Sequence, residues 1–291
     1  MIEQSNRAGI FLMIATTFVF ATQDGISRHL ADTYNTFMVV MVRYWFFAAF
    51  VIVIAARQPG GIRQTARTEQ LGLQIFRGLL LAAEILVAIY GFTLIGLIES
   101  HAVFASYPLI VAALAGPFLG EKAGWRRWLA ILAGFFGMLI ILQPGSGVFQ
   151  PAAIIPLISG FMFAVYALTT RFAARKDAAM TSFFWTGVAG AAATTLVGLP
   201  NWESMSVIDA GWMLALCITG VLGHWLLIRC YEVAEASAVQ PFAYFHLVFA
   251  VLIGLIIFGE GMRSNVAIGA AVIVGAGIFT LWRAHVVAKR V

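Results

Sequence analysis

Residues 99–121 read E-S-H-A-V-F-A-S-Y-P-L-I-V-A-A-L-A-G-P-F-L-G-E, an apolar run that contains proline and stops at a Gly-Glu pair. A second stretch of the same design, residues 235–260, reads E-A-S-A-V-Q-P-F-A-Y-F-H-L-V-F-A-V-L-I-G-L-I-I-F-G-E. A short turn and another apolar run rich in small residues follow each of them. The two stretches lie about half a chain length apart, which predicts two homologous halves, and in a membrane protein such a repeat is typical of transporters.

The composition of the chain excludes a soluble protein. Of its residues, 62% are hydrophobic and 11% are charged, whereas soluble domains are about 45–50% apolar and about 25% charged. Apolar runs long enough to cross a bilayer recur to the end of the sequence. The first run, which follows Arg7, is too long for the apolar part of a signal peptide. We therefore expect an all-α polytopic membrane protein with a retained first helix.

The apolar runs predict ten transmembrane helices joined by short loops. Their expected ranges are 8–29, 34–56, 71–95, 98–119, 125–143, 151–172, 181–199, 208–230, 237–258 and 264–285. The first five helices form an expected domain over residues 1–145, and the last five form a second domain over residues 146–291.

The basic residues predict the orientation of the chain. Arg28 and Arg263 lie in outer loops and Arg43 and Arg77 lie inside helices if the amino terminus is cytoplasmic. The other fourteen of the 18 lysines and arginines then lie on the cytoplasmic side: Arg7, Arg57, Arg63, Arg67, Lys122, Arg126, Arg127, Arg171, Arg175, Lys176, Arg229, Arg283, Lys289 and Arg290. This asymmetry follows the positive-inside rule, so both termini are expected in the cytoplasm.

Five helices in each half imply that the halves insert with opposite orientations. The turn at Glu121 is then cytoplasmic, and the turn at Glu260 faces outward. Inverted repeats of this kind enclose a central site near the middle of the membrane, which opens alternately to each side. The competing interpretation is that apolar helices resemble one another by chance.

Several motifs resemble those of a known family. They are Val42-Arg43-Tyr44, Arg77-Gly78, the run from Ser106 to Glu121 and the run from Ala236 to Glu260. With these, the chain resembles the EamA-type branch of the drug/metabolite transporter superfamily, and most of all the bacterial exporters of aromatic amino acids and methyl viologen. The resemblance implies ten helices in two inverted repeats, cytoplasmic termini and a metabolite carrier without an ATP-binding domain. One departure is Leu247, which stands where the first half has Pro108.

Three charged residues inside apolar runs are candidates for a substrate cavity. Asp24, Arg43 and Glu84 are expected at one depth in the outer half of the membrane. A charge at the bilayer centre costs about 2.5–3.5 kcal/mol on insertion scales, so each needs a partner or a wet cavity. Arg43 is expected to pair with Glu84 or Asp24. Such a pair either clamps the helices or meets the zwitterionic end of a substrate, and the sequence leaves both interpretations open.

Further candidates are histidine, aromatic residues and prolines. Glu84 and His246 are the candidates for proton coupling. Histidine can carry a proton because it titrates near neutral pH, although His246 fits a core position equally well. Tyr90, Tyr107, Tyr166, Trp185, Trp225 and Tyr244 are candidate cavity walls for a flat solute, with packing as the alternative role. Pro108 and Pro241 break helical hydrogen bonds and are expected to act as hinges.

Together with the family resemblance, which implies the exported substrate class, these observations predict a secondary transporter of the bacterial inner membrane that exports aromatic amino acids or related small metabolites. A carrier of a nucleoside, threonine or a drug-like cation such as methyl viologen is the alternative. The sequence contains no metal-ligand cluster and no cofactor motif, so we expect no enzyme, no metal and no cofactor. The expected partners are a small-molecule substrate and the lipid bilayer, in a monomer or homodimer. The net charge of +5 follows from the orientation and does not indicate nucleic-acid binding.

Overall fold

A computed structural model describes residues 6–120, 125–142 and 151–288, and every regular element in this part of the chain is a helix. The α-helices are α1 (Asn6–Ala31), α2 (Thr36–Arg57), α3 (Gly61–Ala66), α4 (Leu71–Ile95), α5 (Leu97–Phe104), α6 (Tyr107–Leu119), α7 (Trp125–Leu142), α8 (Ile154–Ala173), α9 (Ala179–Gly198), α10 (Val207–Val233), α11 (Ala236–Ala243), α12 (Phe245–Ile256) and α13 (Ser264–Ala288). Short 3-10 helices cover Pro151–Ala153 and Leu199–Asn201.

Eight stretches of this bundle are long and apolar enough to cross a membrane, and α5–α6 and α11–α12 each count as one of them. The helices α7 and α13 contain shorter apolar segments, Leu132–Ile141 and Ser264–Ala276. Apolar side chains on the outside, such as Phe11, Leu196 and Val207, are largely exposed, as expected where lipid is the solvent. The multi-pass character is thus confirmed, whereas the count of ten spans stays a prediction.

Two of the expected helices are interrupted in the structure. The expected helix 98–119 is divided at Ala105 and Ser106 into α5 and α6, and the expected helix 237–258 is divided at Tyr244 into α11 and α12. Pro108 lies in the first turn of α6. The backbone N–H that proline lacks would have no hydrogen-bond partner within the helix at this position. Pro241 lies inside α11, three residues before the break. The sequence predicted bends near these prolines but placed no interruption.

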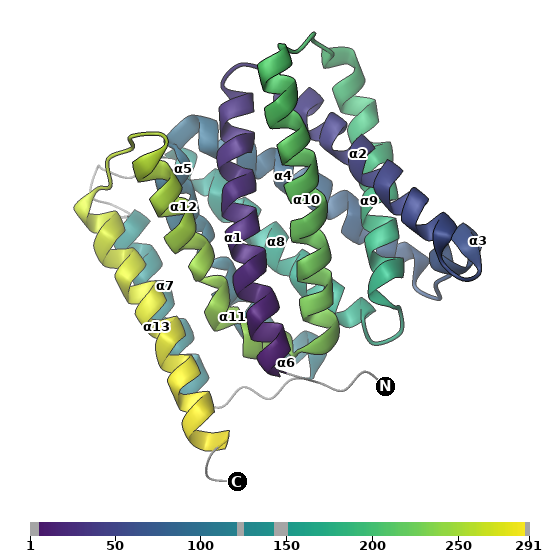
Figure 1. Cartoon of the computed structure of the whole chain (residues 1–291). Coiled ribbons are helices and arrows are strands. Elements are labelled where there is room, and N and C mark those ends of the chain that lie inside the picture. Colours follow the sequence, from purple (N-terminus) through teal and green to yellow (C-terminus); the bar gives the residue numbers. More distant parts are fainter. Residues whose placement is uncertain (1–5, 121–124, 143–150, 289–291) are drawn as a thin grey trace.

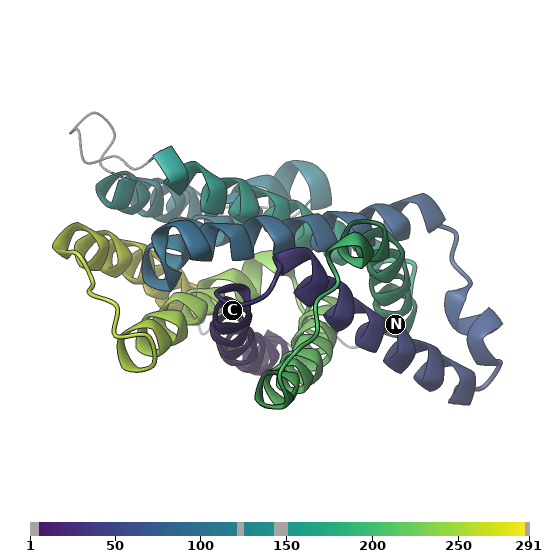
Figure 2. The same cartoon turned by 90° about the horizontal axis from the view of Figure 1, so that it is seen from above.

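The helices pack in matching pairs (Figure 1). The helix α1 packs against α10 and α12, while α8 packs against α4 and α6. The helix α2 packs against α9, and α7 packs against α13. The α7–α13 pair lies at one edge of the bundle and α3 at the opposite edge (Figures 1 and 2).

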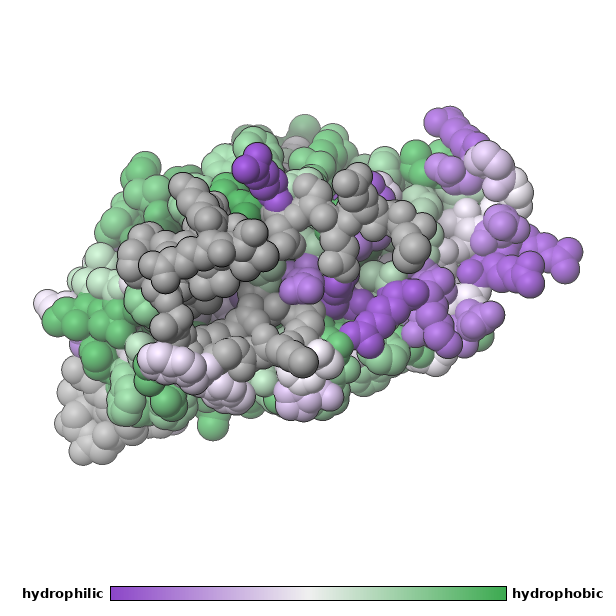
Figure 3. Space-filling view, turned by 90° about the horizontal axis from the view of Figure 1, so that it is seen from below, coloured by the Kyte–Doolittle hydropathy of each residue, from purple (hydrophilic) through white to green (hydrophobic). Residues whose placement is uncertain are grey.

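The helix α1 begins and α13 ends on the same side of the bundle (Figure 1). Seen from that side, hydrophilic residues gather around α3 (Figure 3), where Arg57, Arg63, Arg67 and Glu69 are exposed. An even number of spans predicts termini on one side. Glu121 and the expected domain boundary between residues 145 and 146 lie outside the described residues.

Glycine brings α7 and α13 into close contact. A Cβ atom added at Gly269 would lie 2.5 Å from the carbonyl oxygen of Gly137, and one added at Gly137 would lie 2.9 Å from the carbonyl oxygen of Gly269. A backbone atom cannot rotate out of such a clash as a side chain can. The approach of these two helices therefore requires glycine at both positions, as is common between membrane helices.

Replacing Gly269 by alanine is therefore expected to destabilise the protein by about 1–3 kcal/mol, the usual cost of overpacking. Gly275 lies on the same helix, and a Cβ atom there meets nothing within 4 Å. Gly275→Ala is the matched control and should leave the Tm unchanged or raise it, because alanine favours helix. Thermal unfolding in detergent micelles measures both variants. Equal Tm values for the two would show that α7 and α13 do not pack in this way.

Candidate functional site

A cavity of about 40 Å³ lies among α1, α2, α4, α5, α8, α10 and α12. We call it the central cavity. Its titratable lining consists of Asp24, Arg43, Glu84, His101, His224 and His246. Four phenylalanine rings complete much of the wall, those of Phe20, Phe92, Phe104 and Phe163. Charges of both signs and aromatic surface therefore meet at one place inside a largely apolar bundle.

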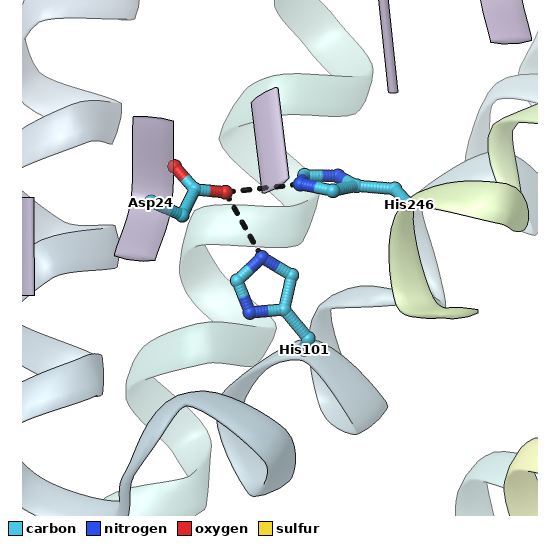
Figure 4. A group of neighbouring side chains, drawn as sticks. All are labelled: Asp24, His101 and His246. Carbon is cyan, nitrogen blue, oxygen red and sulfur yellow. Dashed lines mark hydrogen bonds and ion pairs between the residues drawn. The ribbon is translucent and has the colours of Figure 1, made fainter. Parts of the chain in front are cut away.

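Asp24 holds two histidines in the central cavity (Figure 4). Its Oδ2 atom lies 3.0 Å from Nε2 of His101 and 2.9 Å from Nε2 of His246. The two imidazole rings are nearly perpendicular, with centroids 4.7 Å apart. On its other side, His101 places Nδ1 3.0 Å from the carbonyl oxygen of Leu97. The long helix α1 is thus joined through one carboxylate to both short helices, α5 and α12.

The other two charges in the central cavity have polar neighbours of their own. A guanidinium nitrogen of Arg43 lies 3.1 Å from Nε2 of His224. The Ser159 hydroxyl donates a hydrogen bond of 2.6 Å to Glu84. The expected ion pair between Arg43 and Glu84 or Asp24 is not among the contacts of these residues. The sequence could not identify these partners, because His224 lies 181 positions from Arg43 and Ser159 lies 75 positions from Glu84.

A cap at the end of α12 holds the start of α5 near this cluster. Both carboxylate oxygens of Glu260 accept backbone hydrogen bonds, from Leu97 N–H at 2.9 Å and Ile98 N–H at 2.8 Å. Glu260 also pairs with Arg28, one helical turn beyond Asp24 on α1. Gly96 makes the turn into α5 with φ of 82°, and a Cβ atom there would lie 3.1 Å from the Glu260 carboxylate. We refer to these contacts as the Glu260 cap.

Four of the ten cavity candidates line the central cavity, namely Asp24, Arg43, Glu84 and His246. His101 and His224 line it as well, and the sequence did not single them out as cavity residues. The one available signal was that they are histidines inside apolar runs.

The six aromatic candidates lie outside the central cavity. Tyr107 and Tyr166 are buried behind its wall, against Phe163. Tyr244 is buried in a separate apolar cluster with Leu247 and Val266.

The other three aromatic candidates lie farther away. Trp185 donates its indole N–H to the carbonyl oxygen of Ala66 at 3.0 Å. Trp225 lines an apolar groove with Phe183. Tyr90 is 55% exposed on the outside of α4. The structure places these six rings away from the wall of the central cavity. The sequence could not show this, because an aromatic ring is equally stable against lipid, in the core or at a cavity.

The positions of two tyrosines allow a direct comparison. Tyr107→Ala is expected to destabilise the protein by about 3–5 kcal/mol, the usual cost of removing a buried aromatic ring. Tyr90→Ala removes an exposed ring and should change the free energy of unfolding by less than about 0.5 kcal/mol. Thermal unfolding in detergent tests both. A larger loss for Tyr90→Ala would place that ring in the interior.

The family comparison covers nearly the whole chain. The model of the EamA-like transporter family matches it twice, over residues 7–143 and 150–282.

Similar proteins with known roles are transporters. A riboflavin transporter of Vibrio cholerae is 27% identical over 278 residues, which cover 94% of this chain and 93% of that protein. An S-adenosylmethionine uptake transporter of Rickettsia felis is 25% identical over 274 residues, which cover 94% of this chain and 92% of that protein. A solved crystal structure has a TM-score of 0.72 at 16% identity and covers 96% of this chain and 98% of that chain. This last likeness concerns the fold alone.

Proposed function

Because the chain belongs to the EamA-like transporter family and is a multi-pass membrane protein that transports a small molecule, we propose a finer function for it. It is a secondary transporter that exports aromatic amino acids or related small metabolites by alternating access.

The central cavity carries this proposal. Its phenylalanine rings suit a flat apolar solute, while Arg43 can meet a carboxylate, and Asp24 or Glu84 can meet an amino group. Binding sites commonly combine an apolar wall with a few convergent polar groups in this way. An aromatic amino acid carries all three features in one molecule.

The size of the cavity supports alternating access. A buried water molecule needs roughly 10–15 Å³ of cavity volume. The central cavity of about 40 Å³ therefore holds only a few waters. An amino acid enters only after helices move apart. We propose that α5–α6 and α11–α12 move about their breaks near Pro108 and Pro241, and that the Glu260 cap opens and closes one side.

We also propose that residues 1–145 and 146–291 are inverted repeats. In this arrangement α1 corresponds to α8, α4 to α10, and α6 to α12. The α1–α10 contact then has its counterpart in the α8–α4 contact, and the α1–α12 contact has its counterpart in the α8–α6 contact. The family model matches once in each half. Together with the basic residues, this supports ten spans with cytoplasmic termini in a bacterial inner membrane.

Glu84 is our candidate for proton coupling. It is a buried carboxylate on the cavity wall whose described hydrogen bond comes from the neutral Ser159. A carboxylate in this position can bind a proton when the substrate leaves, as acidic residues do in other membrane carriers.

A second candidate function is uptake rather than export. The similar protein of Rickettsia felis is named as an uptake transporter of S-adenosylmethionine, and that of Vibrio cholerae is named as a transporter of riboflavin. Both compounds contain a flat ring system, which fits the same phenylalanine wall.

Transport by purified protein in proteoliposomes tests the substrates that these alternatives imply. Radiolabelled phenylalanine, tryptophan, threonine, adenine, riboflavin and S-adenosylmethionine are compared in a counterflow assay, which detects a carrier and excludes an open pore. We expect counterflow of phenylalanine and tryptophan. Transport of threonine but not phenylalanine, or of riboflavin or S-adenosylmethionine alone, would overturn the proposed substrate class.

A further inference from the structure

We propose that Asp24, His101 and His246 form a binding site for a divalent transition-metal cation, represented by Zn²⁺. Their ligand atoms all lie within 4.8 Å of one another (Figure 4). The residues come from α1, α5 and α12, and they are separated in sequence by 77 and 222 positions from Asp24. A sequence motif therefore could not reveal this site. The proposal concerns the metal itself and does not depend on the identity of the transported solute.

The hydrogen-bonding capacity of His101 favours a cation at this place. The carbonyl oxygen of Leu97 can only accept, so Nδ1 of His101 carries the proton that it donates. A neutral ring then has a bare lone pair at Nε2, which points at the Asp24 oxygen 3.0 Å away. Two acceptors face each other unless a cation lies between them or an additional proton is bound. A metal ion satisfies both atoms at once.

The surroundings of His101 match those of a metal ligand. Histidines that bind metals almost always donate their other N–H to a carbonyl, carboxylate or water, which fixes the ring. The Leu97 carbonyl has this role here, and the Phe92 ring stacks on the imidazole with centroids 5.0 Å apart. The Glu260 cap in turn holds the N–H of Leu97. His101 is therefore oriented before any ion binds.

The donor set indicates which ions fit. Two imidazole nitrogens and one carboxylate oxygen suit Zn²⁺ and similar ions, whereas Ca²⁺ and Mg²⁺ prefer oxygen ligands alone. Tetrahedral Zn²⁺ with bonds near 2.0–2.2 Å holds its ligand atoms about 3.3 Å apart. The two Asp24–histidine distances of 3.0 and 2.9 Å need to lengthen by a few tenths of an ångström, and the two histidine nitrogens, which lie within 4.8 Å of each other, need to move closer together.

Three protein ligands leave a fourth coordination position open. All three residues line the central cavity, so the open position faces the space available to a solute. The alternative occupant of the site is a proton, which would convert one of the two rings to imidazolium without any bound metal. The experiment distinguishes these occupants.

The first measurement uses the full-length wild-type protein, purified without a polyhistidine tag and stripped with a chelator. Equilibrium dialysis against Zn²⁺ should give one bound ion per chain. The zinc K-edge X-ray absorption spectrum of the loaded protein should show the outer-shell scattering of two imidazole ligands. Absence of bound Zn²⁺, or a spectrum without imidazole scattering, would overturn the proposal. Because this measurement needs no variant, it does not depend on the folding of mutants.

The second measurement compares variants. Asp24→Asn, His101→Gln and His246→Gln should each weaken Zn²⁺ binding by at least tenfold and abolish the rise in Tm that Zn²⁺ produces in the wild type. His224→Gln is the matched control, because His224 is a buried cavity histidine that contacts Arg43 instead of Asp24. His29→Gln, near Asp209, controls for an exposed histidine. An equal loss in His224→Gln and His246→Gln would contradict the assignment.

Discussion

Replacing Glu260 by alanine is expected to destabilise the protein by about 1–3 kcal/mol, the usual cost of leaving buried polar groups without their partners. The Glu260 side chain is only 14% exposed and that of Arg28 is 18% exposed. The substitution leaves the backbone N–H groups of Leu97 and Ile98 without the acceptors that Glu260 supplies. The free end of α5 would then fray, and Arg28 would lose its carboxylate partner.

Glu99→Ala provides the matched control on the same side of the bundle. Glu99 forms an ion pair with Arg263, with 2.6 Å between Oε1 and Nε, but the Arg263 side chain is 36% exposed. An ion pair in contact with water contributes only about 0–1 kcal/mol. Thermal unfolding of both variants in detergent makes the comparison. If Glu99→Ala lowers the Tm as much as Glu260→Ala does, the Glu260 cap has no special role.

Replacing Glu84 by glutamine is expected to uncouple transport from a pH gradient. If one proton enters for each substrate molecule that leaves, a gradient of about one pH unit drives about tenfold accumulation of substrate on the acidic side. Glutamine keeps the size and an acceptor for Ser159 but cannot bind and release a proton at neutral pH. The variant should therefore show counterflow without accumulation. Proteoliposomes with and without an imposed gradient measure both quantities.

Ser159→Ala is the control for this experiment. It removes the hydrogen bond of 2.6 Å to Glu84 but leaves the carboxylate in the central cavity. Accumulation driven by the gradient should persist in this variant. Undiminished accumulation in Glu84→Gln would show that the coupling proton binds elsewhere.

The sequence predicted the helices well because an apolar run of bilayer length has few other stable structures. The observed α4 (Leu71–Ile95) coincides with its expected range, and most others differ by a few residues. The interruptions before Tyr107 and at Tyr244 were not predicted. A proline removes one hydrogen bond, but whether a helix bends or stops depends on the neighbours that pack around it.

The part of the candidate site that the sequence could predict consists of charged and titratable residues inside apolar runs. Asp24, Arg43, Glu84 and His246 lie at the central cavity because charged and titratable groups in lipid are costly. Their partners depend on contacts between distant segments. Arg77 illustrates this limit, since it is fully buried and its guanidinium donates to the Thr170 hydroxyl at 3.1 and 2.8 Å. No pattern near residue 77 reveals a partner 93 positions away.

The bridge from Asp24 to His101 and His246 has a mechanical consequence. One histidine belongs to α5 in the first half of the chain, and the other belongs to α12 in the second half. A swing of either short helix pulls on the same carboxylate, so neither can travel far unless the other follows or a contact breaks. In the alternating access that we propose, this shared contact couples the movement of the two halves, so that opening on both sides of the membrane at once is disfavoured.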